Sequence, residues 1–195
     1  AAMAKEKRIW LIRHGETEWT LSGQHTSVTD IALTKAGERQ GAALGRELAG
    51  KQFGAVLSSP RTRALETARL AGYRGVVQVE NNLQEWNYGD YEGITTADIR
   101  KHTPGWLIWD GPIPGGETSD QVAARADRAI ARAMEIDGEV ALFAHGHILR
   151  VLTARWLGLP AKGGQLFALE TGSISILGFE RENRVISRWN LVPPV

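Results

Sequence analysis

Ile9-Trp10-Leu11-Ile12-Arg13-His14-Gly15 is the most informative segment of the chain. Its apolar first half predicts a buried strand, and its last three residues lie on the loop into which that strand leads. Arg13 offers a planar fork of donors that suits phosphate or carboxylate oxygens, His14 can be neutral and nucleophilic near pH 7, and Gly15 allows a ligand to approach the backbone. Taken alone, the loop is also consistent with a surface connection that carries a solvated arginine.

Strands and helices alternate along the rest of the chain. Short apolar runs predict further strands at about 55–57, 76–79, 139–144, 174–179 and 185–190. Apolar residues at helical spacing predict helices over about 35–49, 61–71, 119–135 and 146–157. Residues 14–30 are expected to form a polar loop. Because the strands alternate with helices at short spacing, we expect an α/β fold, with three α/β/α layers and a mostly parallel central sheet.

The segment from about 86 to 118 breaks this regular pattern. It is rich in glycine and proline, and Trp86, Trp106 and Trp109 are interleaved with them. We expect an irregular cap over one face of the sheet, within a single domain that covers residues 1–195. The tryptophans are expected to pack in the core and the cap rather than to form a platform for nucleobases.

Composition and charge exclude several classes of function. The 195 residues are 43% hydrophobic, which suits one domain with a sizeable core. The 23 Lys and Arg nearly balance the 22 Asp and Glu, so no global basic field favours nucleic acid. The chain has no cysteine, and its apolar runs are shorter than a membrane span. Residues 1–7 lack the apolar segment of a signal peptide. We expect a cytoplasmic protein that binds neither nucleic acid nor membrane.

Several residues of chemical interest are expected at one edge of the sheet. His14 and His145 each follow directly on a predicted strand. Arg63 lies at the start of the helix after the second strand, and Glu85 lies in the loop after the third. In parallel sheets, ligands bind beyond the carboxyl ends of the strands, where helix N-termini also favour anions. The sequence therefore predicts a phosphate site at this edge.

The chain resembles the histidine phosphatase superfamily, the phosphoglycerate-mutase-like proteins, from its first strand to its last. The matching segments, in order, are Arg13-His14-Gly15-Glu16-Thr17, Ser59 through Arg63-Ala64 with Thr67-Ala68, Glu85 with Gly89 and Glu92-Gly93, Gly115-Gly116-Glu117, and Ala144-His145-Gly146. The resemblance implies a phosphoglycerate-mutase-like fold and a single catalytic domain.

The resemblance also implies a role for each matching residue. His14 would be the nucleophile that becomes phosphorylated, and Glu85 the general acid and base. Arg13, Arg63 and His145 would hold the transferring phosphoryl group. Two arginines and a protonated His145 can supply the positive charge that other phosphoryl-transfer enzymes take from Mg²⁺, so no metal or other cofactor is expected.

Other positions are expected to bind substrate or to support the site. Glu16 and Glu117 would orient parts of the site rather than perform chemistry. Thr20 stands where many family members carry an asparagine that touches the phosphate, and a hydroxyl can donate similarly. Thr26 is expected to contact the substrate as well.

Hydrolysis and mutase activity are the alternatives within the family. Related mutases carry a long insertion with paired arginines after the position of Glu92-Gly93. Here the segment 94–116 is short, and its cationic residues are Arg100, Lys101 and His102. The resemblance therefore favours a phosphatase that hydrolyses small phosphate monoesters through phosphohistidine, with a phosphoglycerate mutase as the alternative.

Finer motifs are similar to the fungal sedoheptulose-bisphosphatase group and its small bacterial phosphatase relatives. They are Thr17-Glu18-Trp19, Ser22-Gly23-Gln24, Glu85-Trp86, Tyr88 through Gly93, Trp109-Asp110-Gly111, and His145-Gly146-His147 with Leu149-Arg150. This similarity implies a small phosphorylated metabolite, such as a sugar phosphate or bisphosphate, as the partner. Arg150 or His25 would contact its distal group.

Two further interpretations use the same residues. His147 could join His14 and Glu85 in a metal site, but the spacing is not a recognised ligand pattern and the nearby arginines would repel a cation. The chain could also be a phospholigand-binding module without catalysis, although the expected catalytic residues are all present. The sequence leaves the oligomeric state open, a homodimer included.

Overall fold

A computed structural model describes residues 7–195, and all but one residue of the segment tested for a signal peptide lies outside that range. The described chain contains a sheet with strand order β3-β2-β4-β1-β5-β6. Its strands are β1 (Ile9–Arg13), β2 (Ala55–Ser58), β3 (Val77–Val79), β4 (Val140–Ala144), β5 (Ile174–Glu180) and β6 (Asn183–Leu191). The strands β1, β2, β3 and β4 pair in parallel with one another. The strands β5 and β6 continue the sheet from β1 as an antiparallel hairpin. The expected mostly parallel sheet is confirmed.

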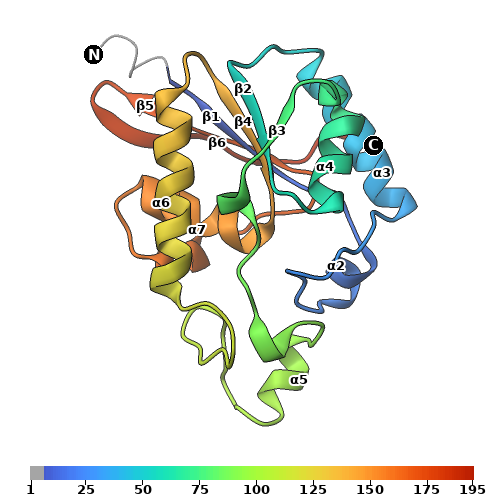
Figure 1. The fold of residues 1–195 in the computed structure, drawn as a ribbon, viewed down its shortest axis with the longest axis vertical. Coiled ribbons are helices and arrows are strands. Elements are labelled where there is room, and N and C mark those ends of the chain that lie inside the picture. The colour runs from blue at the N-terminus through green and yellow to red at the C-terminus, as the bar shows by residue number, and fades with distance from the viewer. Residues whose placement is uncertain (1–6) are drawn as a thin grey trace.

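Helices cover both faces of this sheet, as Figure 1 shows, with α6 and α7 on one side and α3 and α4 on the other. The α-helices are α2 (Glu18–Ser22), α3 (Lys35–Leu48), α4 (Thr62–Ala68), α5 (Thr96–Arg100), α6 (Ser119–Glu135) and α7 (Gly146–Trp156). The three-layer arrangement is therefore confirmed.

The central strands are mostly apolar because both of their faces are buried. Leu11 and Leu142 belong to the hydrophobic core beneath α6 and α7. Ile12 and Phe143, one residue further on, belong to the core beneath α3 and α4. Successive side chains of a strand point to opposite faces, so each strand supplies both cores.

Several short elements depart from the sequence expectations. The expected polar loop 14–30 contains α2, whose N-cap residue Thr17 forms a capping box with Thr20. The helix expected over 61–71 is divided into α4 and a π-helix, Arg69–Tyr73, in which Gly72 has φ 102°. A 3₁₀-helix, Ala161–Leu166, follows α7 and was not expected. One or two turns are too few to produce an apolar period, which is why the sequence did not predict these elements.

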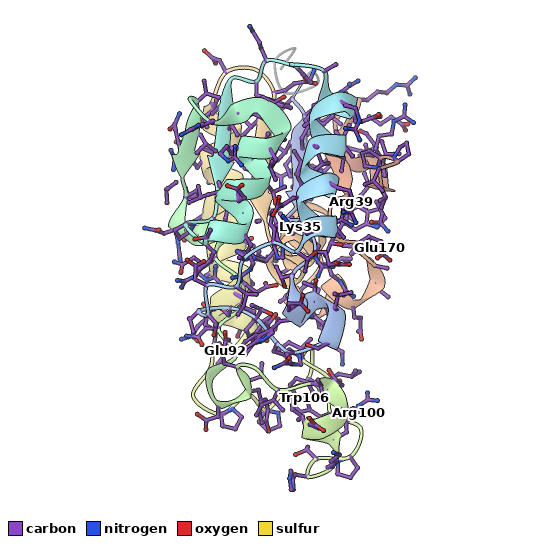
Figure 2. The ribbon with its side chains drawn as sticks, turned by 90° about the vertical axis from the view of Figure 1, so that its right-hand side faces the viewer. Lys35, Arg39, Glu92, Arg100, Trp106 and Glu170 are labelled. Atoms are coloured by element: carbon purple, nitrogen blue, oxygen red, sulfur yellow. The ribbon has the colours of Figure 1, made fainter. Side chains whose placement is uncertain are left out.

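The segment 86–118, called the cap, contains short helices joined by irregular chain. They are the 3₁₀-helix Gly89–Tyr91 and the helix α5, and a further 3₁₀-helix, Asn81–Leu83, lies just before the cap. Trp106 is buried in the cap, and its indole N–H donates to the carbonyl of Pro112 at 2.8 Å. Arg100 donates to the carbonyl of Trp106, and Figure 2 shows both side chains at this end of the molecule. In Figure 1 the cap lies below the carboxyl ends of the parallel strands.

Within the described chain, none of the helices combines the length and the apolar character needed to cross a lipid bilayer.

Candidate active site

The register of β1 against β4 brings His14 and His145 together. The two strands pair in parallel with Arg13 opposite Ala144, so the residue after each strand leaves the sheet at the same edge. The backbone N–H of His14 donates to the carbonyl of Ala144 at 3.0 Å. The two imidazole rings lie 5.1 Å apart, centroid to centroid, at 67°. The strand ends predicted from sequence therefore form one site.

His14 is held as a neutral imidazole with one nitrogen available. Its Nδ1 lies 2.7 Å from the carbonyl oxygen of Gly15. A carbonyl can only accept, so Nδ1 carries the proton and Nε2 keeps its lone pair. Burial lowers the pKa of His14 well below its ordinary value, and the charges of Arg63 and Arg13 lower it further. Neutral His14 can therefore act as a nucleophile near pH 7.

Gly15 is required for close packing of the His14 loop against its neighbours. A Cβ at this position would lie 2.5 Å from the carbonyl oxygen of Gly37 in the first turn of α3. The backbone N–H of Gly15 donates to the hydroxyl of Thr67 in α4 at 3.0 Å. The glycine therefore brings the His14 loop into direct contact with two helices.

Two arginines lie beside His14 with part of their donors unused. Arg63 is fully buried and donates to the carbonyls of Thr29, Ser27 and Thr26 at 2.8, 3.0 and 3.3 Å. Arg13 donates to the carbonyl of Leu169 at 2.5 Å. Among the described residues, the Nε atoms of both arginines and Nδ1 of His145 are buried without a hydrogen-bond partner. Unpaired buried donors are costly, and a phosphate group would satisfy them.

His145 is buried in the ligand-free protein, and its surroundings disfavour a charged imidazole. Its Nε2 lies 2.8 Å from the hydroxyl of Ser59. Burial lowers the pKa of His145 well below its ordinary value, and the positive charge of Arg63 adds to the effect. In the ligand-free protein, burial and the charge of Arg63 therefore favour the neutral form of His145, and the protonated His145 expected to hold a phosphoryl group stays a prediction for the ligand-bound site. A phosphate dianion bound there would act in the opposite direction and favour protonation.

Glu85 faces the first turn of α7 and caps it. Its Oε2 accepts from the backbone N–H of His147 at 2.9 Å, and its Oε1 accepts from those of Ile148 and Trp86 at 2.8 and 2.9 Å. The N-cap residue of α7 is His145, whose side chain makes no capping bond within the described chain. Glu85 thus satisfies helix donors that would otherwise be unpaired, and leaves the His145 ring free to face the site.

The loop that carries Glu85 is clamped by Arg125 from α6, which the sequence did not reveal. Arg125 makes a two-bond ion pair with Glu117, at 2.8 Å for each bond. It also donates to the carbonyls of Asn82, Gln84 and Glu85 at 2.8, 2.7 and 3.3 Å. Glu117 in turn accepts from the backbone N–H of Asn87 at 2.8 Å. The expectation that Glu117 orients the site agrees with these contacts.

A second clamp holds the loop that supplies the partners of Arg63. The carboxylate of Glu92 accepts from the backbone N–H of Ser27 at 2.9 Å. It also accepts from the N–H and hydroxyl of Thr29, at 3.0 and 2.8 Å. Figure 2 shows Glu92 at the junction of the main body and the cap. The resemblance marked Glu92 as a matching position, and the structure supplies the reason for it.

A cavity of about 320 Å³ opens in front of His14. Arg13, His14 and Glu85 contribute to its wall, whereas Arg63 and His145 are buried and do not line it. The remaining lining residues are Trp19, Thr20, Gly23, Gln24, His25, Thr26, Tyr88, Thr96, Leu107, Ile108, Trp109, Gly146, His147 and Arg150. Three of the five residues expected to do the chemistry therefore line this cavity.

Thr20, Thr26 and Arg150, which are expected to contact the substrate, line this cavity, but their polar groups already have partners. The Thr20 hydroxyl donates to the carbonyl of Thr17 at 2.9 Å, and the Thr26 hydroxyl donates to that of Gln24 at 3.0 Å. Arg150 donates through Nε to the carbonyl of Gly164 at 3.1 Å. Contacts from these side chains to a ligand stay predictions.

Tyr88 and His147 form a polar pair on the cavity wall. The Tyr88 hydroxyl lies 2.5 Å from His147 Nδ1, and His147 Nδ1 lies 4.0 Å from Glu85 Oε2. Burial raises the pKa of Tyr88 well above its ordinary value and lowers the pKa of His147 well below its own. Both groups are therefore neutral near pH 7. Within residues 7–195, no group of three or more His, Cys, Asp or Glu side chains is arranged to hold a metal ion.

Comparisons with known proteins agree with this geometry. The model of the histidine phosphatase superfamily (branch 1) matches residues 9–192. An acid phosphatase of Mycobacterium tuberculosis is 43% identical over 192 residues, covering 94% of this chain and 92% of the relative. Sedoheptulose 1,7-bisphosphatase of Saccharomyces cerevisiae is 36% identical over 185 residues, covering 78% of this chain and 68% of the relative.

A solved structure is similar over nearly its whole length. The protein of the open reading frame Rv3214 from Mycobacterium tuberculosis superposes with a TM-score of 0.90 at 42% identity, covering 95% of this chain and 98% of that one. Because the family model spans the chain from β1 to β6 and these relatives share both sequence and fold, the chain belongs to the histidine phosphatase superfamily, branch 1.

Proposed function

We propose that this protein hydrolyses small phosphate monoesters through a phosphohistidine formed on His14. The observation that carries the proposal is the neutral His14, whose Nε2 is free beside the unpaired donors of Arg13 and Arg63. Phosphate monoesters hydrolyse so slowly in water that catalysis requires strong stabilisation of the charge on the transferring group. The two guanidiniums supply that charge within the protein itself.

The first step transfers the phosphoryl group from the substrate to His14. Nε2 attacks phosphorus in line, the N–P bond forms, and the bond from phosphorus to the leaving oxygen breaks. The carboxylic acid form of Glu85 gives its proton to that oxygen, so the product leaves as a neutral alcohol. In this arrangement the carboxyl of Glu85 is held by backbone donors at the N-terminus of α7. It lines the cavity that the leaving group would occupy.

The second step returns His14 to its starting state. Water attacks phosphorus while the carboxylate of Glu85 accepts its proton, the N–P bond breaks, and inorganic phosphate leaves. Nε2 regains its lone pair and Glu85 its proton, so the cycle closes without a net change in the protein. Arg13 and Arg63 neutralise the phosphoryl oxygens in both steps.

A sugar phosphate is the substrate class that we favour. The cavity in front of His14 combines hydroxyls and imidazoles with aromatic faces, as a polyhydroxylated leaving group requires. The similarity to a sedoheptulose 1,7-bisphosphatase supports the same class. Arg150, on the cavity wall, would contact a distal anionic group of a bisphosphate.

A quench experiment tests the phosphohistidine. The protein is mixed briefly with a ³²P-labelled sugar phosphate and denatured in alkali, where phosphohistidine survives. We expect about one label per chain that is released by acid, and no label on the His14→Ala variant. Label that is absent from the wild-type protein while it still binds phosphate would instead support a phospholigand-binding module.

A substrate panel decides between hydrolysis and phosphoglycerate mutase activity. It compares phosphorylated sugars, glycerates and a generic aryl phosphate under the same conditions. We expect release of inorganic phosphate from sugar phosphates to be faster than isomerisation of 3-phosphoglycerate. The reverse order would overturn the assignment as a phosphatase.

A further inference from the structure

A second cavity lies next to the cavity in front of His14, and the two share one wall. The second cavity, of about 300 Å³, lies between the cap and the start of α6. It is lined by Trp86, Ile108, Trp109, Asp110, Gly111, Pro112, Ile113, Gly116, Glu117, Thr118 and Ser119. Ile108 and Trp109 line both cavities. These two residues therefore form the partition between the catalytic cavity and the second cavity.

Trp109 is the larger part of the partition, and it is held on several sides. It is buried, with 8% of its surface exposed. Its ring lies 5.3 Å from that of His147 and 6.1 Å from that of Trp86, edge to face in both cases. The guanidinium of Arg150 stacks at 4.9 Å from the ring centroid. These contacts fix the indole between the two cavities.

Because Gly164 has no side chain, the indole of Trp109 can pack directly against the backbone there. A Cβ at Gly164 would lie 2.8 Å from Cζ3 and 2.9 Å from Cη2 of Trp109. Real side chains do not approach so closely, so any larger residue at 164 would push the far edge of the indole away. The carbonyl of Gly164 also accepts from Arg150, so one turn supports both the indole and the guanidinium that stacks on it.

The second cavity has the chemistry of a site for a neutral group. Of the described residues that line it, none is lysine or arginine. The carboxylate of Glu117 is occupied by Arg125, and that of Asp110 by Lys162 at 2.6 Å. A second phosphate group would find no positive charge there, whereas an aromatic or neutral sugar ring would contact tryptophan, isoleucine and hydroxyl groups.

We propose that Trp109, supported by Gly164, is a specificity-determining residue that limits the size of the leaving group. The proposal rests on the phosphatase activity proposed above. With the indole in place, the leaving group has the catalytic cavity alone. A smaller side chain at 109 joins the two cavities and admits larger neutral leaving groups next to His14.

Binding of phosphonates tests this size limit without requiring hydrolysis. Calorimetry compares the dissociation constants of methylphosphonate and 1-naphthylmethylphosphonate for the wild-type protein, Trp109→Ala and Trp109→Phe. We expect the preference for the naphthyl compound, expressed as the ratio of the two constants, to rise about tenfold or more in Trp109→Ala and less in Trp109→Phe. In Gly164→Ala the new methyl group displaces the indole but leaves it between the cavities. We expect this variant to shift the ratio of the two dissociation constants several-fold from the wild-type value, but not to reach the rise of Trp109→Ala.

Hydrolysis supplies the second measurement. The ratio of kcat/KM for 1-naphthyl phosphate to that for glycerol 1-phosphate should follow the same order among the variants. Trp189→Ala is the matched control, because Trp189 packs on Phe167 at 5.6 Å and lines neither cavity. We expect this control to keep the wild-type ratio.

The outcomes separate the size limit from the proposed activity. A ratio of dissociation constants that does not rise in folded Trp109→Ala or Trp109→Phe protein overturns the role of Trp109. If both ratios rise as much in Trp189→Ala, the effect is general loosening and the role is again overturned. If phosphonate binding follows the expected order but no ester is hydrolysed, the size limit holds and the phosphatase proposal fails.

Discussion

At the scale of single residues, the reactivity of His14 follows from its immediate neighbours. The carbonyl of Gly15 fixes the tautomer, and burial beside Arg63 and Arg13 keeps the ring neutral by lowering its pKa. The same arginines that would hold the phosphoryl group therefore also prepare the nucleophile. Positive charge has two effects here, because it disfavours imidazolium and favours a bound dianion.

Glu85→Gln separates the two proton transfers. Glutamine cannot donate a proton to an alkoxide, so we expect kcat/KM for glycerol 1-phosphate to fall by about 10²–10⁴-fold. An aryl phosphate with a good leaving group needs no such proton, so its phosphoryl group should still reach His14. Since glutamine also cannot activate water, stopped-flow measurements should show a burst of about one phenolate per chain followed by slow turnover.

The backbone donors around Glu85 predict that Glu85→Gln also lowers the free energy of unfolding. The carboxylate accepts three backbone N–H bonds through both oxygens, whereas a glutamine amide would direct its NH₂ group at one of these donors. One buried N–H is then left unsatisfied, which costs about 1–3 kcal/mol. Denaturation in urea measures this cost. A variant that shows no burst and unchanged alkyl-phosphate turnover would contradict the role of Glu85.

At the scale of elements, the sequence predicted what periodicity and strand ends can reveal. The main strands and the helices α3, α6 and α7 produce clear apolar patterns, and parallel strands necessarily direct His14 and His145 to one edge. The helices α2 and α5 were not predicted because five residues carry no period. The antiparallel pairing of β5 with β1 also had no local signal, since it depends on how the chain returns to the sheet.

The residues that position the site are less evident from the sequence than the residues that do its chemistry. Arg125 contacts carbonyls that are 40 to 43 positions away along the chain, and no local pattern encodes such contacts. One signal was present: Arg125 lies three residues after Val122 and four before Ala129, both on the buried face of α6. An arginine on that face needs partners inside the protein, and the loop of Glu85 provides them.

Arg125→Lys tests whether α6 positions the general acid. Lysine keeps the charge but cannot bond Glu117 twice while also reaching the three carbonyls. A shift of about 1 Å in Glu85 would lower kcat for alkyl phosphates by about 10²-fold. The effect on the first phosphoryl transfer from a good aryl leaving group should be much smaller, because that step does not need the proton.

Arg128→Lys is the matched control on the same helix. Arg128 is exposed and bonds only the side chain of Asn82 among the described residues, at 3.0 Å. We expect wild-type kinetics with both substrate types. Equal losses for alkyl and aryl substrates in Arg125→Lys would mean that Arg125 acts on folding alone and does not position Glu85.

At the scale of the whole molecule, the neutral histidines couple the site to stability. His14, His145 and His147 have pKa values lowered well below 6.5, each mainly by burial. In the unfolded chain they take up protons near pH 6.5, whereas in the folded protein they do so only at lower pH. The unfolded state then binds more protons than the folded state, so acid favours unfolding.

The free energy of unfolding should therefore decrease as the pH falls from about 6.5 to 5. Each histidine contributes a slope of up to about 1.4 kcal/mol per pH unit. The buried Glu80 has a pKa below its ordinary 4.5, so its own contribution is lost only at more acidic pH. Urea denaturation at several pH values measures the slope, and His147→Asn should reduce it by up to about 1.4 kcal/mol per unit.

Phosphate should oppose this loss of stability. A dianion beside Arg13, Arg63 and His145 binds the folded protein alone, so the free energy of unfolding rises with phosphate concentration as RT ln(1 + [L]/Kd). It also favours the protonated form of His145, so the slope with pH should become shallower when phosphate is saturating. A slope that is equally steep with and without saturating phosphate would show that His145 does not gain a proton with the ligand. In that case the two arginines alone would carry the positive charge of the site.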